Sequence, residues 1–466
     1  MGIKDLNSLR QVFEEMEYKE NLFERTICNT YYWKLIRIYV FNDLAVKLGI
    51  TSATHPNLKR NNLKSAIATE RIRLQNNAFF QKGETDYVVY RHRRRINVNE
   101  KFIEVNTEYL PYLVPELKNK RVTYIETGIA FENRNVEEKS QFLMPSPITS
   151  LVYGLFFKVK SKSNAVKNEL AFINKIIESY FGFKFDLSNR IINNIKGFKL
   201  SYNLHKRYLK KKNPGKVFLV CSYGKEGIIA AARSLGIETI EIQHGIIYPF
   251  HMGYSYPQNT SIPYFPDKIM LYGDFWKDQA SFPIERLSRL AVGNPYAELQ
   301  IKKYSDTEKE KNSMLFISSG QYGVQLSKLA VDYHKQHPEY RIYYKLHPSE
   351  FKVWPDLYPH LKASEDDGLI VVEDKINLYE LFARSNYLVG VNSTAIYESF
   401  SLLDKVILYN TSGIEVMKSL ATDYNIPLVE STEGLYETVI HYPNNVKVDR
   451  DSIYKNVSNL LDNNQD

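Results

Sequence analysis

The hydrophobic positions near the start of the chain follow a helical spacing. These positions are Ile36, Val40, Leu44 and Leu48. Because they recur every four residues, they fall on one face of a helix. Gly49 follows directly, where a glycine often ends a helix in a left-handed conformation. We therefore expect residues 1–80 to be mainly helical.

A different pattern follows the helical region. Short runs of β-branched and aromatic residues, separated by polar turns, occur at 87–90, 102–105 and 122–125. Runs of this length and composition are typical of strands. The period of the hydrophobic pattern therefore predicts a change from helices to a sheet.

From residue 216 onward, a strand, a loop and a helix follow one another repeatedly. The predicted strands are 217–220, 237–242, 269–272, 314–317, 342–346, 369–372, 387–391 and 405–408. The predicted helices of the later part include 378–383 and 394–403. This alternation is typical of parallel sheets with helices on their faces.

The composition shifts near residue 295, just before a charged stretch that starts at Lys302. We place a domain boundary there. The expected fold class is α/β, with two Rossmann-like, doubly wound domains and a helical N-terminal extension. The N-terminal domain would comprise residues 1–295 and the C-terminal domain residues 296–466.

Length and composition agree with an ordinary globular protein. A chain of 466 residues is long enough for two or three domains, and 44% hydrophobic with 24% charged residues excludes disorder over most of its length. Two cysteines cannot form a disulfide framework or a four-thiolate zinc site, and they favour a reducing compartment. The first 20 residues contain no apolar signal segment, and the apolar run at 148–157 is too short to span a bilayer. We expect a cytoplasmic protein.

The formal net charge of +8 is compatible with a nucleic acid, an anionic membrane surface or a phosphorylated substrate as partner. Two basic clusters stand out, at 91–95 and 206–212. Such a run is most often a solvated face, and the alternative is contact with a phosphate or lipid headgroup. Nucleic-acid binding ranks last, because the chain contains no recognisable recognition module.

Small hydroxyl, glycine and histidine residues stand at three predicted strand ends of the C-terminal half. They are Ser318, Ser319 and Gly320 after the first strand, His347 and Pro348 after the second, and Asn392, Ser393 and Thr394 after the fourth. In open parallel sheets, ligands bind outside the carboxyl ends of the strands. Each motif alone has a plain structural explanation, but three together favour a binding site.

Each of these residues has a chemical use toward a nucleotide. Ser393 and Thr394 start a helix, whose free N–H groups bind phosphate. A glycine such as Gly320 lets the backbone approach an anionic oxygen. His347 is suited to donate a hydrogen bond to a leaving phosphate, with Pro348 holding the turn. One turn into the helix, Glu398 is suited to accept hydrogen bonds from ribose hydroxyls or a base.

The N-terminal half contributes one similar strand end, at Gln243, His244 and Gly245. A polar, aromatic and proline-rich segment follows at 246–266, which is too long for a plain connection and is a candidate functional loop. A buried, structural role is the alternative for His244.

Three motifs together carry a resemblance to a known family. They are the His244–Gly245 pair, the Lys-x-His-Pro sequence at 345–348, and the Ser-Thr-x-x-x-Glu-Ser sequence at 393–399. They resemble the GT-B glycosyltransferases of bacterial capsule and surface polysaccharides, a group that includes the sialic-acid and Kdo transferases with HP and S/T motifs. More distantly, they resemble the glycerol-phosphate transferases of teichoic acid. The resemblance covers about residues 216–410.

The resemblance implies two Rossmann-like domains facing across a cleft, with the nucleotide-activated donor in the C-terminal domain. His347 would contact the donor phosphate, and Ser393 with Thr394 the nucleotide phosphate. His244 matches the histidine that is the general base in the glycerol-phosphate relatives. Those relatives usually carry tryptophan before it, where this chain has Gln243, so the sugar-transferring branch fits better.

The implied reaction moves a sugar from a nucleotide donor, such as a CMP-linked one, to a hydroxyl of a growing surface glycan or lipid-linked glycan. It needs a base and electrophilic help for the departing phosphate. His244, Glu226 or Glu126 would be the base, although Glu226 is also placed simply to charge a helix N-terminus. Lys345 would join His347 at the phosphate. We expect no metal and no other cofactor.

Two alternatives remain at this stage. One is transfer of a polyol phosphate from a CDP-linked donor, and the other is a non-catalytic protein that binds a nucleotide sugar or glycan. The basic clusters further suggest reversible attachment at an anionic membrane surface, on the inner face of the cytoplasmic membrane.

Overall fold

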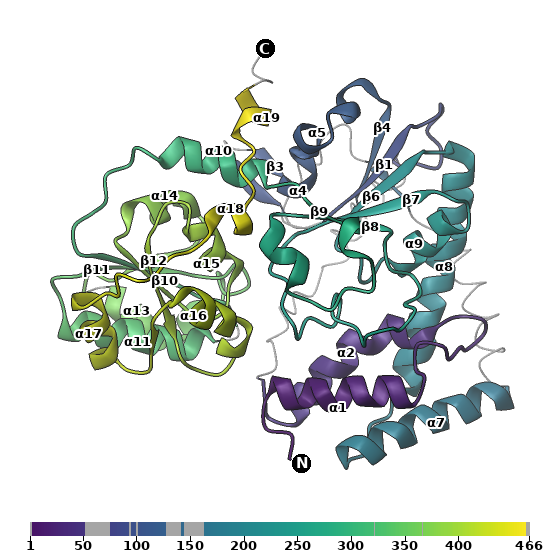
Figure 1. Ribbon diagram of the computed structural model, residues 1–466, viewed down its shortest axis with the longest axis horizontal. Coiled ribbons are helices and arrows are strands. Elements are labelled where there is room, and N and C mark those ends of the chain that lie inside the picture. Colours follow the sequence, from purple (N-terminus) through teal and green to yellow (C-terminus); the bar gives the residue numbers. More distant parts are fainter. Residues whose placement is uncertain are drawn as a thin grey trace. The chain divides into compact units, whose positions relative to one another are not determined.

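The structure is a computed structural model, and it describes residues 2–51, 75–92, 95–98, 101–126, 141–143, 163–320, 322–365 and 367–462. Most of the described residues up to Gly293 form one compact unit, and those from Asn294 to Ser458 form a second (Figure 1). Each unit contains its own sheet. We call them unit 1 and unit 2.

The sheet of unit 1 has seven strands in the order β5-β4-β1-β6-β7-β8-β9, and every neighbouring pair is parallel. The strands are β1 (Tyr87–Arg91), β4 (Val122–Glu126), β5 (Gln141–Phe142), β6 (Lys216–Val220), β7 (Glu238–Ile242), β8 (Lys268–Leu271) and β9 (Arg289–Ala291). Three of them precede residue 216, in the part of the chain without recognisable motifs.

One predicted strand, 102–105, is wrong in extent and in place. Strand β3 (Lys101–Ile103) ends earlier and pairs with β2 (Ile96–Val98) in a separate antiparallel ribbon. The next residue, Glu104, accepts hydrogen bonds from the backbone N–H groups of Asn106 and Thr107 and so starts helix α4 (Val105–Glu108). An N-cap carboxylate of this kind favours a helix over further extended chain.

Unit 1 also contains further helices, before and between its strands. They are α1 (Leu6–Lys19), α2 (Tyr32–Lys47), α5 (Leu110–Leu113), η1 (Pro115–Asn119), α7 (Asn164–Phe181), α8 (Ser188–Lys212), α9 (Glu226–Arg233), η2 (Asp274–Asp278) and η3 (Arg286–Ser288). The predicted helical start is confirmed for α1 and α2, with turns between them, whereas residues 52–74 lie outside the described part. The sequence analysis missed the long helices α7 and α8.

Helix α2 confirms the hydrophobic stripe read from the sequence. Ile36, Val40 and Leu44 are fully buried. Gly49 has φ +73°, the left-handed conformation expected of a residue that follows a helix end.

The two faces of the first sheet have separate cores, because successive side chains on a strand point to opposite faces. On one face, Val88 and Leu219 pack with residues of α8 and α9. On the other face, Val89 and Phe218 pack with Leu110 of α5. The strands are therefore buried on both sides, as their near-continuous hydrophobic runs predict.

A buried arginine joins the N-terminal helices to the long loop 246–266. Arg37 of α2 donates from Nε to Glu17 Oε1 and from Nη2 to Glu17 Oε2, both at 2.8 Å. Its Nη1 donates to the carbonyl oxygens of Ser255, at 2.9 Å, and Met252. The Arg37 side chain is completely buried, so the loop is held from inside the protein.

Unit 2 has a six-stranded sheet in the order β12-β11-β10-β13-β14-β15, again parallel throughout. The strands are β10 (Ser313–Ile317), β11 (Arg341–Lys345), β12 (Ile370–Val372), β13 (Tyr387–Gly390), β14 (Lys405–Tyr409) and β15 (Leu428–Val429). The five strands predicted for this region are present within one residue at each end.

Helices follow the strands of unit 2 one by one. They are α10 (Pro295–Tyr304), α11 (Gly323–Gln336), α12 (Trp354–Leu357), α13 (Pro359–Glu365), α14 (Leu378–Arg384), α15 (Thr394–Ser399), η4 (Ile414–Val416), α16 (Lys418–Tyr424), α17 (Thr432–Ile440) and α18 (Arg450–Ile453), and the last described helix of the chain is α19 (Ser458–Asp462). Helix α15 ends four residues earlier than predicted, and a turn follows it at residues 400–402.

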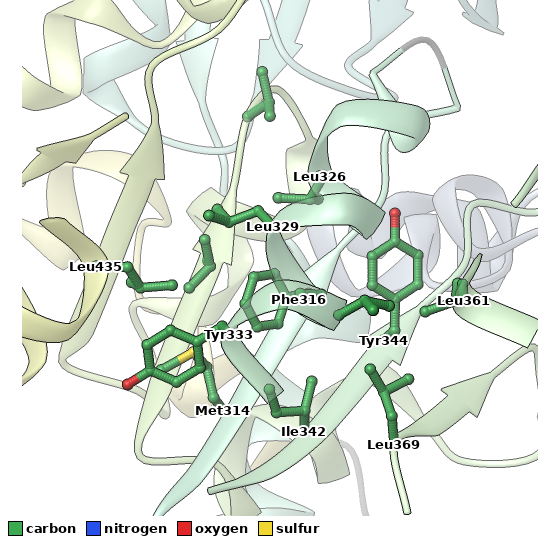
Figure 2. Close-up of a cluster of buried hydrophobic side chains, with 14 of the residues drawn as sticks. Met314, Phe316, Leu326, Leu329, Tyr333, Ile342, Tyr344, Leu361, Leu369 and Leu435 are labelled. Atoms are coloured by element: carbon green, nitrogen blue, oxygen red, sulfur yellow. The ribbon is translucent and has the colours of Figure 1, made fainter. Parts of the chain in front are cut away.

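The core of unit 2 lies between β10, β11 and helix α11. Figure 2 shows Phe316, Ile342 and Tyr344 of the strands beside Leu326 and Leu329 of the helix. All five side chains are buried. Both units are thus Rossmann-like layers of helix and parallel sheet, and the predicted α/β class with two such domains is confirmed.

The Arg37 anchor generates a stability prediction. Replacing Arg37 by methionine leaves Glu17 as an unpaired buried carboxylate, which typically costs about 3–5 kcal/mol of unfolding free energy. Urea unfolding followed by tryptophan fluorescence measures the change. Lys19→Met, which breaks an exposed pair with Glu15, is the control and should leave the midpoint nearly unchanged. Equal midpoints for the two variants would contradict the anchoring role.

Candidate functional site

The three predicted motifs of the C-terminal half lie at one edge of the second sheet. Strands β11, β10 and β13 are neighbours, and the parallel register aligns Ile317 with Lys345 and with Gly390. The residues that follow these three positions therefore leave the sheet side by side. Strand pairing brings together segments that are more than 70 residues apart in the chain.

Gly320 and His347 lie next to each other at this edge. Gly320 has φ +77°, and a Cβ atom added to it would be 3.3 Å from Nδ1 of His347 and 3.0 Å from Oγ of Ser349. A side chain at position 320 would therefore be strained in its backbone and would crowd the imidazole. The glycine keeps this space open for the histidine.

The tautomer of His347 follows from its contacts. The backbone N–H of Ser349 donates to Nδ1 at 3.2 Å, and Oγ of Ser349 is 2.7 Å from the same nitrogen. Because Nδ1 accepts, the proton of the neutral ring resides on Nε2. The imidazole is thereby prepared to donate a hydrogen bond from Nε2, the chemistry predicted for it toward a phosphate.

A buried carboxylate, Glu350, organises the two loops, and the sequence analysis missed it. It accepts from Oγ of Ser318 at 2.8 Å, from the backbone N–H of His347 at 2.6 Å, and from the hydroxyl of Tyr358. Burial raises the pKa of Glu350. The only signal in the sequence is its position three residues after His347, where a carboxylate can reach back to a turn N–H.

The two serines before Gly320 have different surroundings. Ser318 is buried, and its hydroxyl donates a hydrogen bond to Glu350. The hydroxyl oxygen of Ser319 is also shielded from solvent, and it has no hydrogen-bond partner within the part of the chain that the structure describes.

Lys345 ends β11 as a half-buried cation. Burial lowers its pKa to about 8, against the opposing effect of Asp374 and Glu373. Its Nζ lies 5.1 Å from the centre of the Phe351 ring. Pro348, three residues after the strand end, is exposed.

The motif after β13 is the start of a short helix. Ser393 is the N-cap of α15 and accepts from the backbone N–H of Ala395 at 3.2 Å, so the plain capping role weighed for it is present. Asn392, Thr394 and Glu398 are half-buried.

In unit 1, His244 directly follows Gln243 at the end of β7 and belongs to a group of aromatic rings. Its Nε2 is 3.1 Å from the hydroxyl of Tyr223, which stands in the turn after β6. Its ring centre is 5.7 Å from that of His92, which follows β1. Since β1, β6 and β7 are neighbouring parallel strands, these three rings share the carboxyl edge of the first sheet. His92 and Tyr223 were not predicted.

Gln243 itself has a structural role. It is buried, its Nε2 donates to the carbonyl of Gly245 at 2.9 Å, and its Oε1 accepts from the N–H of Tyr272 at 2.8 Å. It ties the strand end of His244 to that of β8.

Glu226 is buried at the start of α9. Its Oε1 accepts from the backbone N–H of Gly224 at 3.1 Å and is 3.7 Å from Nζ of the fully buried Lys34. These contacts fit the helix-terminus role considered for it. Glu126, the other carboxylate considered, is paired with Arg91 and Arg95.

The two basic clusters are partly engaged inside unit 1. Arg91 and Arg95 pair with Glu126, and Arg93 and Arg94 lie outside the described residues. In the second cluster, Lys212 is buried and donates to the carbonyls of Gln81 and Gly83, and the exposed Lys211 donates to the carbonyl of Phe79. These members of the clusters have contacts within unit 1, whereas Arg207 and Lys210 are exposed.

Two features are absent from the described residues. No group of three or more His, Cys, Asp or Glu side chains among them is arranged to hold a metal ion. Within the same residues, no helix is both long and apolar enough to cross a membrane.

Comparisons with known proteins give only remote similarities. No protein-family model and no curated protein matches the chain. Among solved structures, it is similar to MurG of Acinetobacter baumannii, with 11% identity over 77% of this chain and 91% of that chain and a TM-score of 0.44. It is similar to UDP-GlcNAc 2-epimerase of Methanocaldococcus jannaschii, with 12% identity over 80% of this chain and 96% of that chain and a TM-score of 0.45. It is also similar to Anabaena Alr3699/HepE in complex with UDP and glucose, with 9% identity over 82% of this chain and 95% of that chain and a TM-score of 0.40. At such identities and TM-scores, none of these similarities bears on what the chain binds or does.

The packing around Glu350 generates a second prediction. A Cβ atom at Gly323 would overlap the Tyr358 hydroxyl and come within 2.5 Å of Oε1 of Glu350. Gly323→Ala should therefore destabilise unit 2 by about 1–3 kcal/mol, the usual cost of overpacking. Thermal melting is the measurement. Gly434→Ala, whose new atom would meet nothing closer than 3.7 Å, is the matched control and should melt no lower than the wild type. A Gly323→Ala protein that melts like this control would show that Glu350 is not held as described.

Proposed function

We propose that the protein is a glycosyltransferase of the GT-B type, which moves a sugar from a nucleotide-activated donor to a hydroxyl of a glycan or lipid-linked acceptor. The observation that carries the proposal is the edge of the second sheet. There, Gly320 leaves room beside His347, whose Nδ1 is occupied by Ser349 and whose Nε2 carries the proton. This is the arrangement that a hydrogen-bond donor to a leaving phosphate needs.

The donor side of the reaction belongs to unit 2. His347 donates to the phosphate oxygen that departs with the nucleotide, and Lys345, two residues earlier at the end of the same strand, supplies positive charge. The backbone at Ser319 and Gly320 approaches the phosphates, while Asn392, Ser393, Thr394 and Glu398 contact the rest of the nucleotide. The ammonium group of Lys345 and the hydrogen bond from His347 stabilise the negative charge that develops on the leaving phosphate, so we propose a reaction without a metal ion.

The acceptor side belongs to unit 1. His244 is the group that finally takes the acceptor proton, supported by its place among the rings at the carboxyl edge of the first sheet. Glu226 fits this role less well, because its carboxylate is already engaged by Lys34 and by the backbone of Gly224. A CMP-linked donor and a surface-polysaccharide acceptor remain the specific form suggested by the sequence resemblance.

Reversible attachment to an anionic membrane surface is a subordinate part of the proposal. Fewer basic residues support it than the sequence suggested, because Arg91, Arg95 and Lys212 have contacts within unit 1. The exposed Lys210 and Lys211, close to the exposed Phe80, are what remains to support it.

Nucleotide binding is the direct test of the donor site. With CMP, CDP, UDP or GDP at about 100 times its dissociation constant, mass action stabilises the folded protein by about 2.7 kcal/mol, which raises its melting temperature. We expect at least one of the four to do so. His347→Ala should reduce this increase for the bound nucleotide, whereas His441→Ala, a change of an exposed histidine in the same unit, should not.

Three outcomes of this panel, combined with a screen of nucleotide-linked donors for turnover, would contradict the transferase or favour an alternative. Stabilisation by none of the four nucleotides contradicts a nucleotide-dependent transferase. Release of CMP together with a phosphodiester product from a CDP-linked polyol supports the polyol-phosphate alternative. Binding without turnover of any donor, unaffected by His347→Ala, supports a non-catalytic binding protein.

The lowered pKa of Lys345 generates a pH prediction. Its ammonium group is the form that attracts phosphate, and it loses its proton as the pH rises through about 8. Nucleotide affinity should therefore be highest below pH 7 to 8 and fall about tenfold by pH 9, one decade per pH unit above the pKa. Titration calorimetry at pH 7 and 9 measures this. Lys345→Met should weaken binding at pH 7 and remove the dependence, whereas the surface variant Lys335→Met should retain it. The same tenfold fall in Lys345→Met would assign the dependence to another group.

A further inference from the structure

The two nitrogens of His244 differ in access. Nδ1 is shielded from solvent within the protein, and Nε2 is 3.1 Å from the hydroxyl oxygen of Tyr223. A proton that reaches Nε2 along this contact comes from the Tyr223 hydroxyl. Tyr223 as a whole residue is half-buried, so part of it is open to solvent.

Tyr223 is poorly suited to hold a negative charge. Burial is the main cause that raises the pKa of its phenol far above the usual value, and the nearby Cys221 and Glu241 add to the effect. A phenolate is therefore not a stable state of this residue. Tyr223 can release its own proton only while it receives another, which is the behaviour of a relay rather than of a base.

The protein holds Tyr223 firmly from two sides. On one side, the backbone N–H of Ser222 donates to Oε1 of the fully buried Glu241 at 2.9 Å, and the Tyr254 hydroxyl donates to the same oxygen at 2.6 Å. On the other side, Gly253 lies so close that a Cβ atom there would be 2.7 Å from Cδ1 of Tyr223. Strand β7 and the loop 246–266 together fix the phenol against His244.

The loop that carries Gly253 is itself anchored. Arg37 donates to the carbonyl oxygens of Met252 and Ser255, which flank Gly253 and Tyr254 in the chain. The ring of His251 lies 5.3 Å from that of Tyr223 and 4.7 Å from that of Tyr254. The placement of the phenol thus depends on a continuous set of contacts that begins at helix α2.

We propose that Tyr223 is a catalytic residue that relays the acceptor proton to His244. The proposal rests on the transferase function proposed above and adds a group to it. As the acceptor oxygen bonds to the anomeric carbon, the bond from that carbon to the donor phosphate breaks, and its electron pair leaves with the nucleotide. The acceptor proton passes to the Tyr223 oxygen while the phenolic proton passes to Nε2 of His244. The products are the glycoside, the nucleotide and an imidazolium ion.

The test uses the full-length protein and needs no knowledge of the acceptor, because water serves in its place. Nucleotide release is measured from UDP-N-acetylglucosamine, CMP-N-acetylneuraminate and GDP-mannose. We expect Tyr223→Phe and His244→Ala each to lower kcat by about 10²–10⁴, with KM for the donor changed less than about threefold. The double variant should be no slower than either single one, because the two groups act as a unit. Tyr18→Phe, on the exposed surface of α1, should leave kcat unchanged.

Two further measurements separate a relay from a merely structural tyrosine. In mixtures of H₂O and D₂O, the wild-type kcat should decrease non-linearly as the deuterium fraction of the solvent rises, because two protons move together. The Nε2 resonance of His244 in the ¹⁵N spectrum should shift in Tyr223→Phe while the melting temperature is kept. A straight-line isotope dependence, or an unshifted resonance, would overturn the relay.

The outcomes also distinguish the relay from the function on which it depends. If the wild type and Tyr223→Phe release nucleotide equally well and His244→Ala does not, the relay is overturned but the proposed function is not. A wild-type protein that neither binds the four nucleotides nor releases any from these donors would overturn the proposed function, and the relay with it.

Discussion

Parallel strand pairing is the constraint on which both candidate sites depend. It aligns the carboxyl ends of neighbouring strands, so that residues far apart in the chain leave the sheet at one edge. In unit 2 this places Gly320 beside His347, and in unit 1 it places His92, Tyr223 and His244 in one group. A shift of one residue in either register would turn these side chains to the other face of the sheet.

Each edge is completed by a buried carboxylate that binds backbone N–H groups of the loop above it. Glu350 accepts from the N–H of His347, and Glu241 accepts from the N–H of Ser222. Both acids are buried, and burial raises the pKa of each. In both units, therefore, a loop that carries a candidate site residue is fixed by a hydrogen bond from its backbone to a buried carboxyl group.

The sequence pattern anticipated some features better than others. The strands of unit 2 were predicted closely, because fully buried strands give continuous hydrophobic runs between glycine, proline and polar turns. The strand at 102–105 was misplaced, because a single capping carboxylate, Glu104, decided where the helix begins. Helix α8 was missed because its 25 residues are mostly polar and show only a weak periodicity. In the sites, His244 and His347 were found by their positions at strand ends, whereas Glu350 and Tyr223 lie in turns without a repeating pattern.

By itself, the sequence determined the α/β class, the presence of two parallel-sheet units, and the strand ends that carry the candidate site residues, because periodicity and turn residues are local features of the chain. Only the tertiary structure decided which strands are neighbours, that three strands before residue 216 join the first sheet, and that Arg37 reaches the loop 246–266 from the N-terminal helices. It also decided the proton position on His347 and the pairing of Tyr223 with His244. Apart from the contact between His347 and Ser349, which depends on the conformation of one turn, these are contacts between residues distant in the chain, and no local sequence pattern predicts them.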